Sequence, residues 1–190
     1  MAFFPIMLDL DRVPILVVGK GRQVLNRLRQ LGDGSRSLKV YSDAPSAELR
    51  DYCGNSLIPH LPVAADLVAG GVIFIGDYPP EQAHAIANPA RAAGMLTNIE
   101  DVTAGCDFHT PSLVRRGDLL LTVSTGGHSP ALAVRIKQFL AEKFSEDWGE
   151  NLREIAAERQ KWRAMNLPYP EIKQKSDEFI STKGWFEKLG

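Results

Sequence analysis

The first 41 residues read as strand, glycine turn, helix and strand, and this order constrains the fold more than any other feature of the chain. Residues 13–19 (VPILVVG) form a short, β-branched apolar run, which is typical of a strand buried on both faces of a parallel sheet. Apolar side chains then repeat at helical spacing until Gly32, and residues 37–41 (SLKVY) are a second predicted strand. Strands that alternate with helices predict parallel pairing with right-handed crossovers.

The same alternation continues to about residue 100. Residues 71–76 (GVIFIG) and 95–99 (MLTNI) are predicted strands, and the alanine-rich segment 80–93 is a predicted helix that Pro89 interrupts. Weaker patterns predict an extended segment at 57–62, a helical turn at 66–69 and a lead-in strand in residues 1–12. We therefore expect an α/β fold with a Rossmann-like parallel sheet.

A second pattern begins after residue 110. Residues 119–123 (LLLTV) are a predicted strand. Ser129 is a predicted helix N-cap, and Pro130 suits the first position of a helix that reaches residue 144. From residue 148 the chain is charged and helical in pattern, with a break at 167–170 (LPYP). We expect three parts, with bounds at 1–110, 111–146 and 147–190.

Charge and cysteine content narrow the class of protein. The formal net charge of −1 lacks the basic excess of a nucleic-acid-binding domain. No apolar run reaches the roughly 18 residues of a membrane span, and the N-terminus has no basic leader. Cys53 and Cys106 are too few for a disulfide framework and lack metal-ligand spacing. We expect a cytoplasmic protein that binds neither nucleic acid nor membrane and holds no resident metal.

The glycine turn after the first strand is a candidate dinucleotide site. Gly19 allows a tight turn, and Gly21 lets the backbone approach a pyrophosphate at the helix N-terminus. Val24 stands where a third small residue is usual, and we expect it to push helix and strand apart. Asp43, 22 residues after Gly21, is a candidate for the ribose hydroxyls and favours NAD over NADP. The alternatives are a plain strand-to-helix turn and a solvated aspartate.

Two further groups suggest substrate chemistry. Asp101 follows a predicted strand at the end where ligands bind in open α/β sheets, and a carboxylate there can act as a general base. Residues 124–129 (STGGHS) place small residues at a helix N-terminus, which attracts anions. Arg115 and Arg116 add candidate cationic contacts. The alternatives are a capping aspartate and a solvated turn.

The pieces in this order resemble the precorrin-2 dehydrogenase / sirohydrochlorin ferrochelatase family, whose module also forms the N-terminal part of siroheme synthase. The matching stretches are FFPIMLDL, ILVVGKG, TNIEDV, DFHTPSLVRRGDL and STGGHSPALAVRIK, within residues 3–140. The resemblance implies an NAD-binding domain at 1–110, a dimerisation region at 111–146, a helical C-terminal segment and a homodimer. It also implies oxidation of precorrin-2 to sirohydrochlorin with NAD⁺, which some members combine with ferrous iron insertion.

The resemblance also assigns roles. It makes Asp101 the catalytic residue. The implied cofactor contacts are Gly19, Gly21, Arg22, Gln23, Asp43, Ala44 and, as a substitute for a family aspartate, Asp77. The expected substrate contacts are Arg115, Arg116, Ser124, Thr125, Gly126, Gly127 and Ser129, of which Thr125 falls on a residue that some members phosphorylate.

The chain departs from the family pattern at Lys20, at Val24 and in the segment IGDYPPEQ (residues 75–82). These departures border the expected cofactor site, so three functions stay open. They are a dehydrogenase with or without iron insertion, a chelatase that has lost its NAD site, and a non-catalytic module that binds a tetrapyrrole or a dinucleotide.

Overall fold

The computed structural model describes residues 3–32 and 38–189, and the chain divides into two compact units. The sheet unit is Phe4–His109, and the hairpin unit is formed mainly by residues from Thr110 onward. The division at 109/110 therefore places the expected regions 111–146 and 147–190 in one unit.

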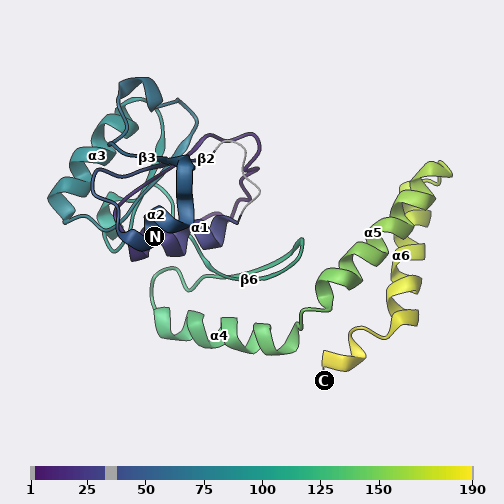
Figure 1. Cartoon of the computed structure of the whole chain (residues 1–190). Helices are drawn as coiled ribbons and strands as arrows, with labels where there is room; N and C mark the ends of the chain where they lie inside the picture. Colours follow the sequence, from purple (N-terminus) through teal and green to yellow (C-terminus); the bar gives the residue numbers. More distant parts are fainter. Residues whose placement is uncertain (1–2, 33–37, 190) are drawn as a thin grey trace. The chain divides into compact units, whose positions relative to one another are not determined.

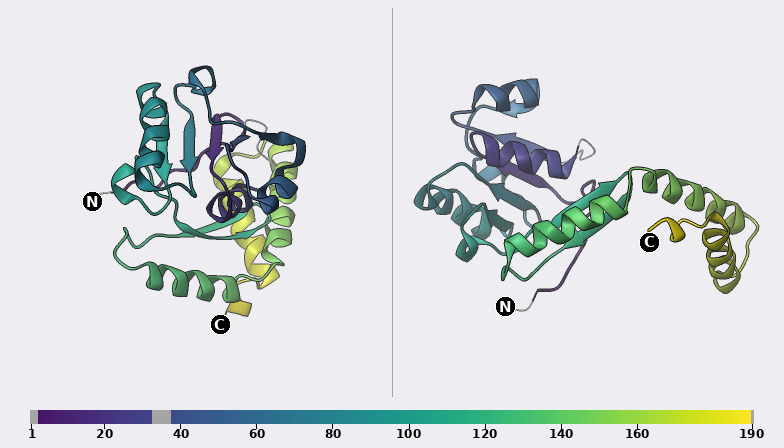
Figure 2. Two further views of the ribbon diagram at one scale, coloured as in Figure 1. Left: turned by 60° about the vertical axis from the view of Figure 1, so that its left-hand side comes forward. Right: turned by 90° about the horizontal axis from the view of Figure 1, so that it is seen from below.

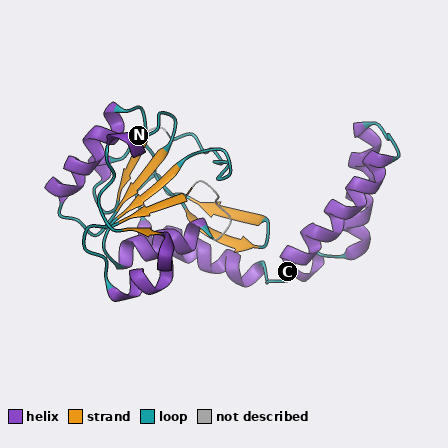
Figure 3. Cartoon of the chain, turned by 45° about the horizontal axis from the view of Figure 1, so that its top comes forward, coloured by secondary structure: helices purple, strands orange, loops and turns teal. Residues whose placement is uncertain are grey.

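Five parallel strands form the sheet unit, in the order β3-β2-β1-β4-β5 (Figures 1 and 3). The strands are β1 (Ile15–Val18), β2 (Leu38–Tyr41), β3 (Leu57–Ile58), β4 (Val72–Ile75) and β5 (Leu96–Ile99). The helices are α1 (Arg22–Leu31), α2 (Ala47–Cys53) and α3 (Pro80–Ala92). This arrangement confirms the predicted Rossmann-like α/β fold.

Strand β1 lies at the centre of the sheet, because Ile15 aligns with Leu38 of β2 on one side and with Val72 of β4 on the other. The chain runs outward from β1 through β2 to β3, and then returns to β4 on the opposite side of β1. The strand order therefore reverses between β1 and β4. Ligands of open α/β sheets bind beyond the carboxyl ends of the two strands at such a point.

Both faces of the sheet are buried, as the apolar strands require. On one face α3 packs its alanines Ala83, Ala87 and Ala90 against Leu16, Val18, Ile73 and Ile75. On the other face α1 and α2 cover Ile15, Val17, Val40 and Phe74. Pro89 does not interrupt α3, because the three buried alanines hold the helix on the sheet from Pro80 to Ala92.

Three of the weaker predictions for the sheet unit differ from the structure, and one helix was missed. Residues 3–12 form no strand: Phe4, Ile6 and Met7 are exposed, and the segment ends in a turn where Val13 N–H donates to Asp9 O at 3.0 Å. Of the predicted extended segment at 57–62, only Leu57–Ile58 forms a strand, β3. The helical turn lies at Ala64–Asp66 instead of 66–69, and helix α2 was not predicted.

The hairpin unit contains an antiparallel pair, β6 (Ser112–Arg116) and β7 (Leu119–Val123), joined through Gly117 at φ +56°. Strand β6 was not predicted. Helix α4 (Pro130–Lys143) lies along the hairpin (Figure 2, right). The Ser129 cap is confirmed, because its Oγ accepts from Leu132 N–H at 3.2 Å.

Two helices complete the hairpin unit. Helix α5 (Trp148–Ala164) and helix α6 (Tyr169–Lys183) pack side by side (Figure 1). The break between them lies at residues 165–168, two residues before the predicted break at 167–170. The ring of Trp148 contacts Phe144 at a centroid distance of 4.9 Å and Phe186 at 5.3 Å. Of the helices in residues 3–32 and 38–189, none is long and apolar enough to cross a membrane.

Candidate cofactor and catalytic site

The carboxylate of Asp77 caps the N-terminus of α1. Its Oδ2 accepts from Gly21 N–H at 2.8 Å and from Val24 N–H at 3.3 Å, and its Oδ1 accepts from Gln23 N–H at 3.0 Å. Asp77 reaches this position because it lies in the turn after β4, next to β1 in the sheet. An anion is favourable there, since the first N–H groups of a helix lack intrahelical partners.

Gln23 links Asp77 to Asp101. The Gln23 amide oxygen accepts from Asp77 N–H, and the Gln23 Nε2 donates to Asp101 Oδ2 at 2.7 Å. Asp77 and Asp101 both have left-handed backbones, at φ +62° and +61°. Such backbones are uncommon outside glycine but are tolerated best by Asp and Asn. Residues from the turns after β1, β4 and β5 therefore meet in one hydrogen-bonded network.

The close approach of α1 to β1 depends on Gly19. A Cβ atom there would lie 2.2 Å from Val24 Cγ2 and 2.5 Å from the carbonyl oxygen of Gly76. The structure accommodates Val24, which is buried, because its side chain fills the space that Gly19 leaves. A Cβ atom at Gly21 would make only ordinary van der Waals contacts, the nearest with Ser46 Oγ at 3.9 Å.

Asp43 lies just beyond β2 and contacts two residues from neighbouring turns. Its Oδ1 accepts from the Tyr78 hydroxyl at 2.7 Å and lies 3.6 Å from Lys20 Nζ. The Lys20 ammonium also lies 4.6 Å from the centre of the Tyr78 ring. Although partial burial raises the pKa of Asp43, the Tyr78 hydrogen bond and the Lys20 charge outweigh it, and the pKa is lowered.

The pKa of Tyr78 is shifted in the opposite direction. Burial raises the pKa of Tyr78, and the hydrogen bond to Asp43 raises it further. The hydroxyl is therefore protonated at neutral pH and donates to an ionised Asp43. The other two implied cofactor contacts, Arg22 and Ala44, are exposed near the same edge of the sheet.

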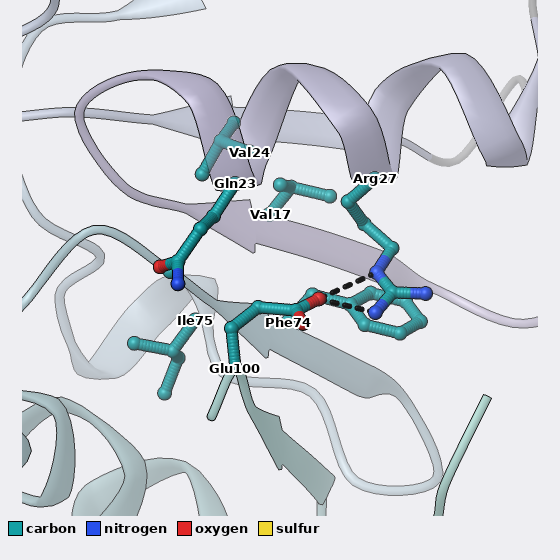
Figure 4. Close-up of a pocket in the computed structure, with 8 residues that line it drawn as sticks. Val17, Gln23, Val24, Arg27, Phe74, Ile75 and Glu100 are labelled. Atoms are coloured by element: carbon teal, nitrogen blue, oxygen red, sulfur yellow. Dashed lines mark hydrogen bonds and ion pairs between the residues drawn. The ribbon is translucent and has the colours of Figure 1, made fainter. Parts of the chain in front are cut away.

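Glu100, the residue before Asp101, forms a partly buried ion pair with Arg27 (Figure 4). The Arg27 guanidinium pairs with Glu100 Oε1, with Nε at 3.1 Å, and lies 4.7 Å from the centre of the Phe74 ring. The Arg27 side chain is only 7% exposed. The pair lines a small pocket together with Val17, Gln23, Val24, Ile75 and Gly76. It ties α1 to the end of β5, where Asp101 begins the next turn.

The predicted substrate contacts lie in the hairpin unit. Arg115 is exposed on β6. Arg116 instead turns to the last turn of α4, where Nε donates to Phe144 O at 2.6 Å and Nη2 to Ala141 O at 3.0 Å. Its Nη1 lies 2.9 Å from Glu146 Oε1. Arg116 therefore caps a helix C-terminus.

The loop before α4 is held by its own hydroxyl groups. Ser124 Oγ accepts from Gly126 N–H at 3.2 Å. Thr125 Oγ1 accepts from Ser129 N–H at 3.3 Å and donates to Ser129 O at 3.1 Å. Gly126 and Gly127 have φ values of +61° and +83°. The loop is a compact turn that leads into α4.

Sequence reasoning missed Tyr78, Arg27 and Glu100. Tyr78 lies in the segment that departs from the family pattern, and a hydroxyl three residues after a buried strand is the signal that marks it. Nothing in the sequence distinguishes Arg27 from the other polar residues of α1. Among residues 3–32 and 38–189, no group of three His, Cys, Asp or Glu side chains has the geometry to hold a metal ion.

Known proteins resemble this chain in sequence and fold. A family model described as "Putative NAD(P)-binding" matches residues 6–112. Siroheme synthase of Ectopseudomonas mendocina is 32% identical over 138 residues, which are 72% of this chain and 30% of that protein. Siroheme synthase of Chromobacterium violaceum is 30% identical over 152 residues, which are 78% of this chain and 32% of that protein. The chain thus spans about a third of the curated relatives it matches.

The fold is also found in a solved structure. A protein described as "SirC, precorrin-2 dehydrogenase" aligns with a TM-score of 0.74 at 20% sequence identity. The alignment covers 98% of both chains, so the likeness of fold includes the sheet unit and the hairpin unit.

Proposed function

Because the chain belongs to this NAD(P)-binding family, which includes the siroheme synthase module and precorrin-2 dehydrogenase, we propose that it oxidises precorrin-2 to sirohydrochlorin with a nicotinamide dinucleotide. The observation that carries the proposal is the network at the carboxyl ends of β1, β4 and β5. There Gln23 joins the glycine turn to the carboxylate of Asp101.

The residues at the reversal of strand order fit a dinucleotide. Gly21 has no side chain at the N-terminus of α1, where a pyrophosphate is favoured. Asp43 lies at the end of the next strand, where a carboxylate binds ribose hydroxyls. Bound NAD⁺ supplies the acceptor for a hydride. Asp77 has to leave the α1 N–H groups before a pyrophosphate binds to them.

The remaining chemistry falls to side chains of this chain. Oxidation of precorrin-2 removes one hydride and one proton from the macrocycle, and the dinucleotide is reduced. Asp101 takes the proton, and Gln23 orients the carboxylate through Oδ2. From the family resemblance we also propose that Arg115, which is exposed on β6, binds a carboxylate of the tetrapyrrole.

The acceptor we propose is NAD rather than NADP. The lowered pKa keeps Asp43 ionised at neutral pH, and a carboxylate at this position repels a 2′-phosphate. Lys20 offsets part of this repulsion because its Nζ lies 3.6 Å from Asp43 Oδ1. We therefore expect a preference for NAD without complete exclusion of NADP.

The test is anaerobic incubation of the protein with precorrin-2, with NAD⁺, with NADP⁺ and with neither, while the absorbance spectrum is followed. Asp101→Asn should lower turnover at least about 100-fold, the usual contribution of a general base. Its NAD⁺ affinity and melting temperature should stay unchanged, because Asn also tolerates φ +61°. Asp51→Asn, an exposed change on α2, is the control.

Each result points to one function. Conversion that requires NAD⁺ and fails in the Asp101 variant supports the proposal. Full activity of Asp101→Asn would remove this carboxylate from the mechanism. If the folded protein does not convert precorrin-2, sirohydrochlorin and ferrous iron are supplied next. Iron insertion then indicates a chelatase, and binding without turnover indicates a carrier or sensor.

A further inference from the structure

Residues 77 and 78 already occupy the groups that a dinucleotide would use. The Asp77 carboxylate accepts three N–H bonds at the N-terminus of α1, with donor–acceptor distances of 2.8, 3.0 and 3.3 Å. The neighbouring Tyr78 hydroxyl donates to Asp43 at 2.7 Å. These are the positions where a pyrophosphate and a ribose hydroxyl bind in Rossmann-like sheets. One turn therefore supplies both an anion and a hydroxyl to the cofactor crevice.

We propose that Asp77 and Tyr78 are internal occupants of the cofactor crevice, and that a dinucleotide binds only by displacing them. The proposal rests on the dinucleotide function proposed above. Two anions cannot share the same N–H groups, so every contact that Asp77 makes with α1 opposes binding of the pyrophosphate. Tyr78 opposes binding of the ribose in the same way, because it uses an oxygen of Asp43. These two residues thus lower the affinity for the cofactor.

The displacement reaches the catalytic carboxylate through Gln23. The Gln23 amide oxygen accepts from Asp77 N–H, while its Nε2 donates to Asp101 Oδ2. When the turn at residues 77–78 moves, Gln23 loses one of the two bonds that hold its side chain. Cofactor binding is thereby coupled to the orientation of Asp101, and Gln23 is the positioning residue between them.

The decisive experiment measures the dissociation constant of NAD⁺ by calorimetry for the full chain and four variants at one ionic strength. Asp77→Asn keeps a side chain that tolerates φ +62° but removes the charge. Since the charge that competes at the helix N-terminus is removed, NAD⁺ should bind about tenfold tighter, which corresponds to about 1.4 kcal/mol. Tyr78→Phe should tighten binding by about 2- to 10-fold, the value of one hydrogen bond.

Two further variants complete the set. Asp77→Gly also removes the carboxylate and adopts a positive φ without strain, so it should tighten binding like Asp77→Asn. Glu81→Gln is the matched control, because Glu81 is an exposed carboxylate in the first turn of α3. Its affinity for NAD⁺ should equal that of the unaltered chain.

A second measurement, of the melting temperature, tests the same competition between Asp77 and NAD⁺ for the N–H groups of α1. The melting temperature of Asp77→Asn without ligand should fall, since the cap of α1 is weakened. The rise in melting temperature on adding NAD⁺ should be larger than for the unaltered chain. A cooperative transition shows that each variant is folded.

The outcomes separate the two proposals. If the unaltered chain binds NAD⁺ and both Asp77 variants bind equally or more weakly, Asp77 is a bystander or a cofactor ligand. The proposed function then stands and this inference is overturned. If only the Asp77 variants bind, the inference holds and the unaltered chain is not an NAD-dependent enzyme. If no folded form binds, both proposals are overturned.

Discussion

At the scale of single residues, the absence of a Cβ atom at Gly19 allows α1 to pack closely against β1. Val24 replaces the small residue expected at its position, yet it packs into the space above Gly19. The pair is complementary, because the bulk added at residue 24 is taken up where residue 19 has no Cβ. Helix α1 therefore still packs closely against β1, with the larger side chain at residue 24 and none at residue 19.

Gly19→Ala should lower the free energy of unfolding by about 1–3 kcal/mol, the usual cost of overpacking. The added methyl group would meet Val24 and the backbone oxygen of Gly76, and a backbone oxygen cannot move aside like the end of a side chain. Urea denaturation measures the change. Gly21→Ala is the control, since its Cβ has no neighbour closer than 3.9 Å. Equal stability of the two variants would contradict the argument.

At the scale of elements, α4 is held at both ends by specific hydrogen bonds. Ser129 caps the N-terminus, and Arg116 donates to the carbonyl oxygens of Ala141 and Phe144 near the C-terminus. A guanidinium is well suited to this task, because its planar fork donates several bonds from fixed directions. The neighbouring arginines of β6 therefore have different environments.

Arg116→Ala should lower the free energy of unfolding by about 1–3 kcal/mol, because it removes charged donors from partly buried carbonyl groups. Arg115→Ala, which alters an exposed residue, should stay within about 0.5 kcal/mol and should raise the KM for precorrin-2. Thermal denaturation and steady-state kinetics separate the two effects. Comparable losses of stability would show that Arg115 is structural as well.

At the scale of the whole molecule, α4 exposes an apolar stripe. Leu132, Ile136 and Phe139 follow helical spacing and are 50%, 37% and 56% exposed. Contiguous exposed apolar side chains mark interaction surfaces more often than chance would place them. From the stripe and the family resemblance together, we propose that two copies of the chain form a homodimer through this helix.

Phe139→Glu should convert the proposed dimer to monomer, because it would place an unpaired charge in an apolar interface. Light scattering coupled to size-exclusion chromatography at a fixed protein concentration measures the mass. Gln138→Glu introduces the same charge at a neighbouring exposed position and should stay dimeric. A monomeric unaltered chain, or dissociation of both variants alike, would contradict the proposed interface.

The sequence alone determined the elements that short-range patterns encode. The buried strands β1 and β4, the helix that follows the glycine turn and the Ser129–Pro130 start of α4 all follow from neighbouring residues. Short, weakly apolar elements were missed or misplaced. Strand β6 and helix α2 form because a partner strand or the sheet covers one side of them. Residues 3–12 are apolar but gain no strand partner.

Only the tertiary structure decided which candidate residues meet. Asp77 lies 56 residues from Gly21, and Asp101 lies 78 residues from Gln23, so no local pattern predicts either contact. They form because the strand order places β4 beside β1 and β5 beside β4, which brings the turns at their carboxyl ends together. The sequence identified a glycine turn and a helix N-terminus, and the sheet topology placed an aspartate of the same chain on it.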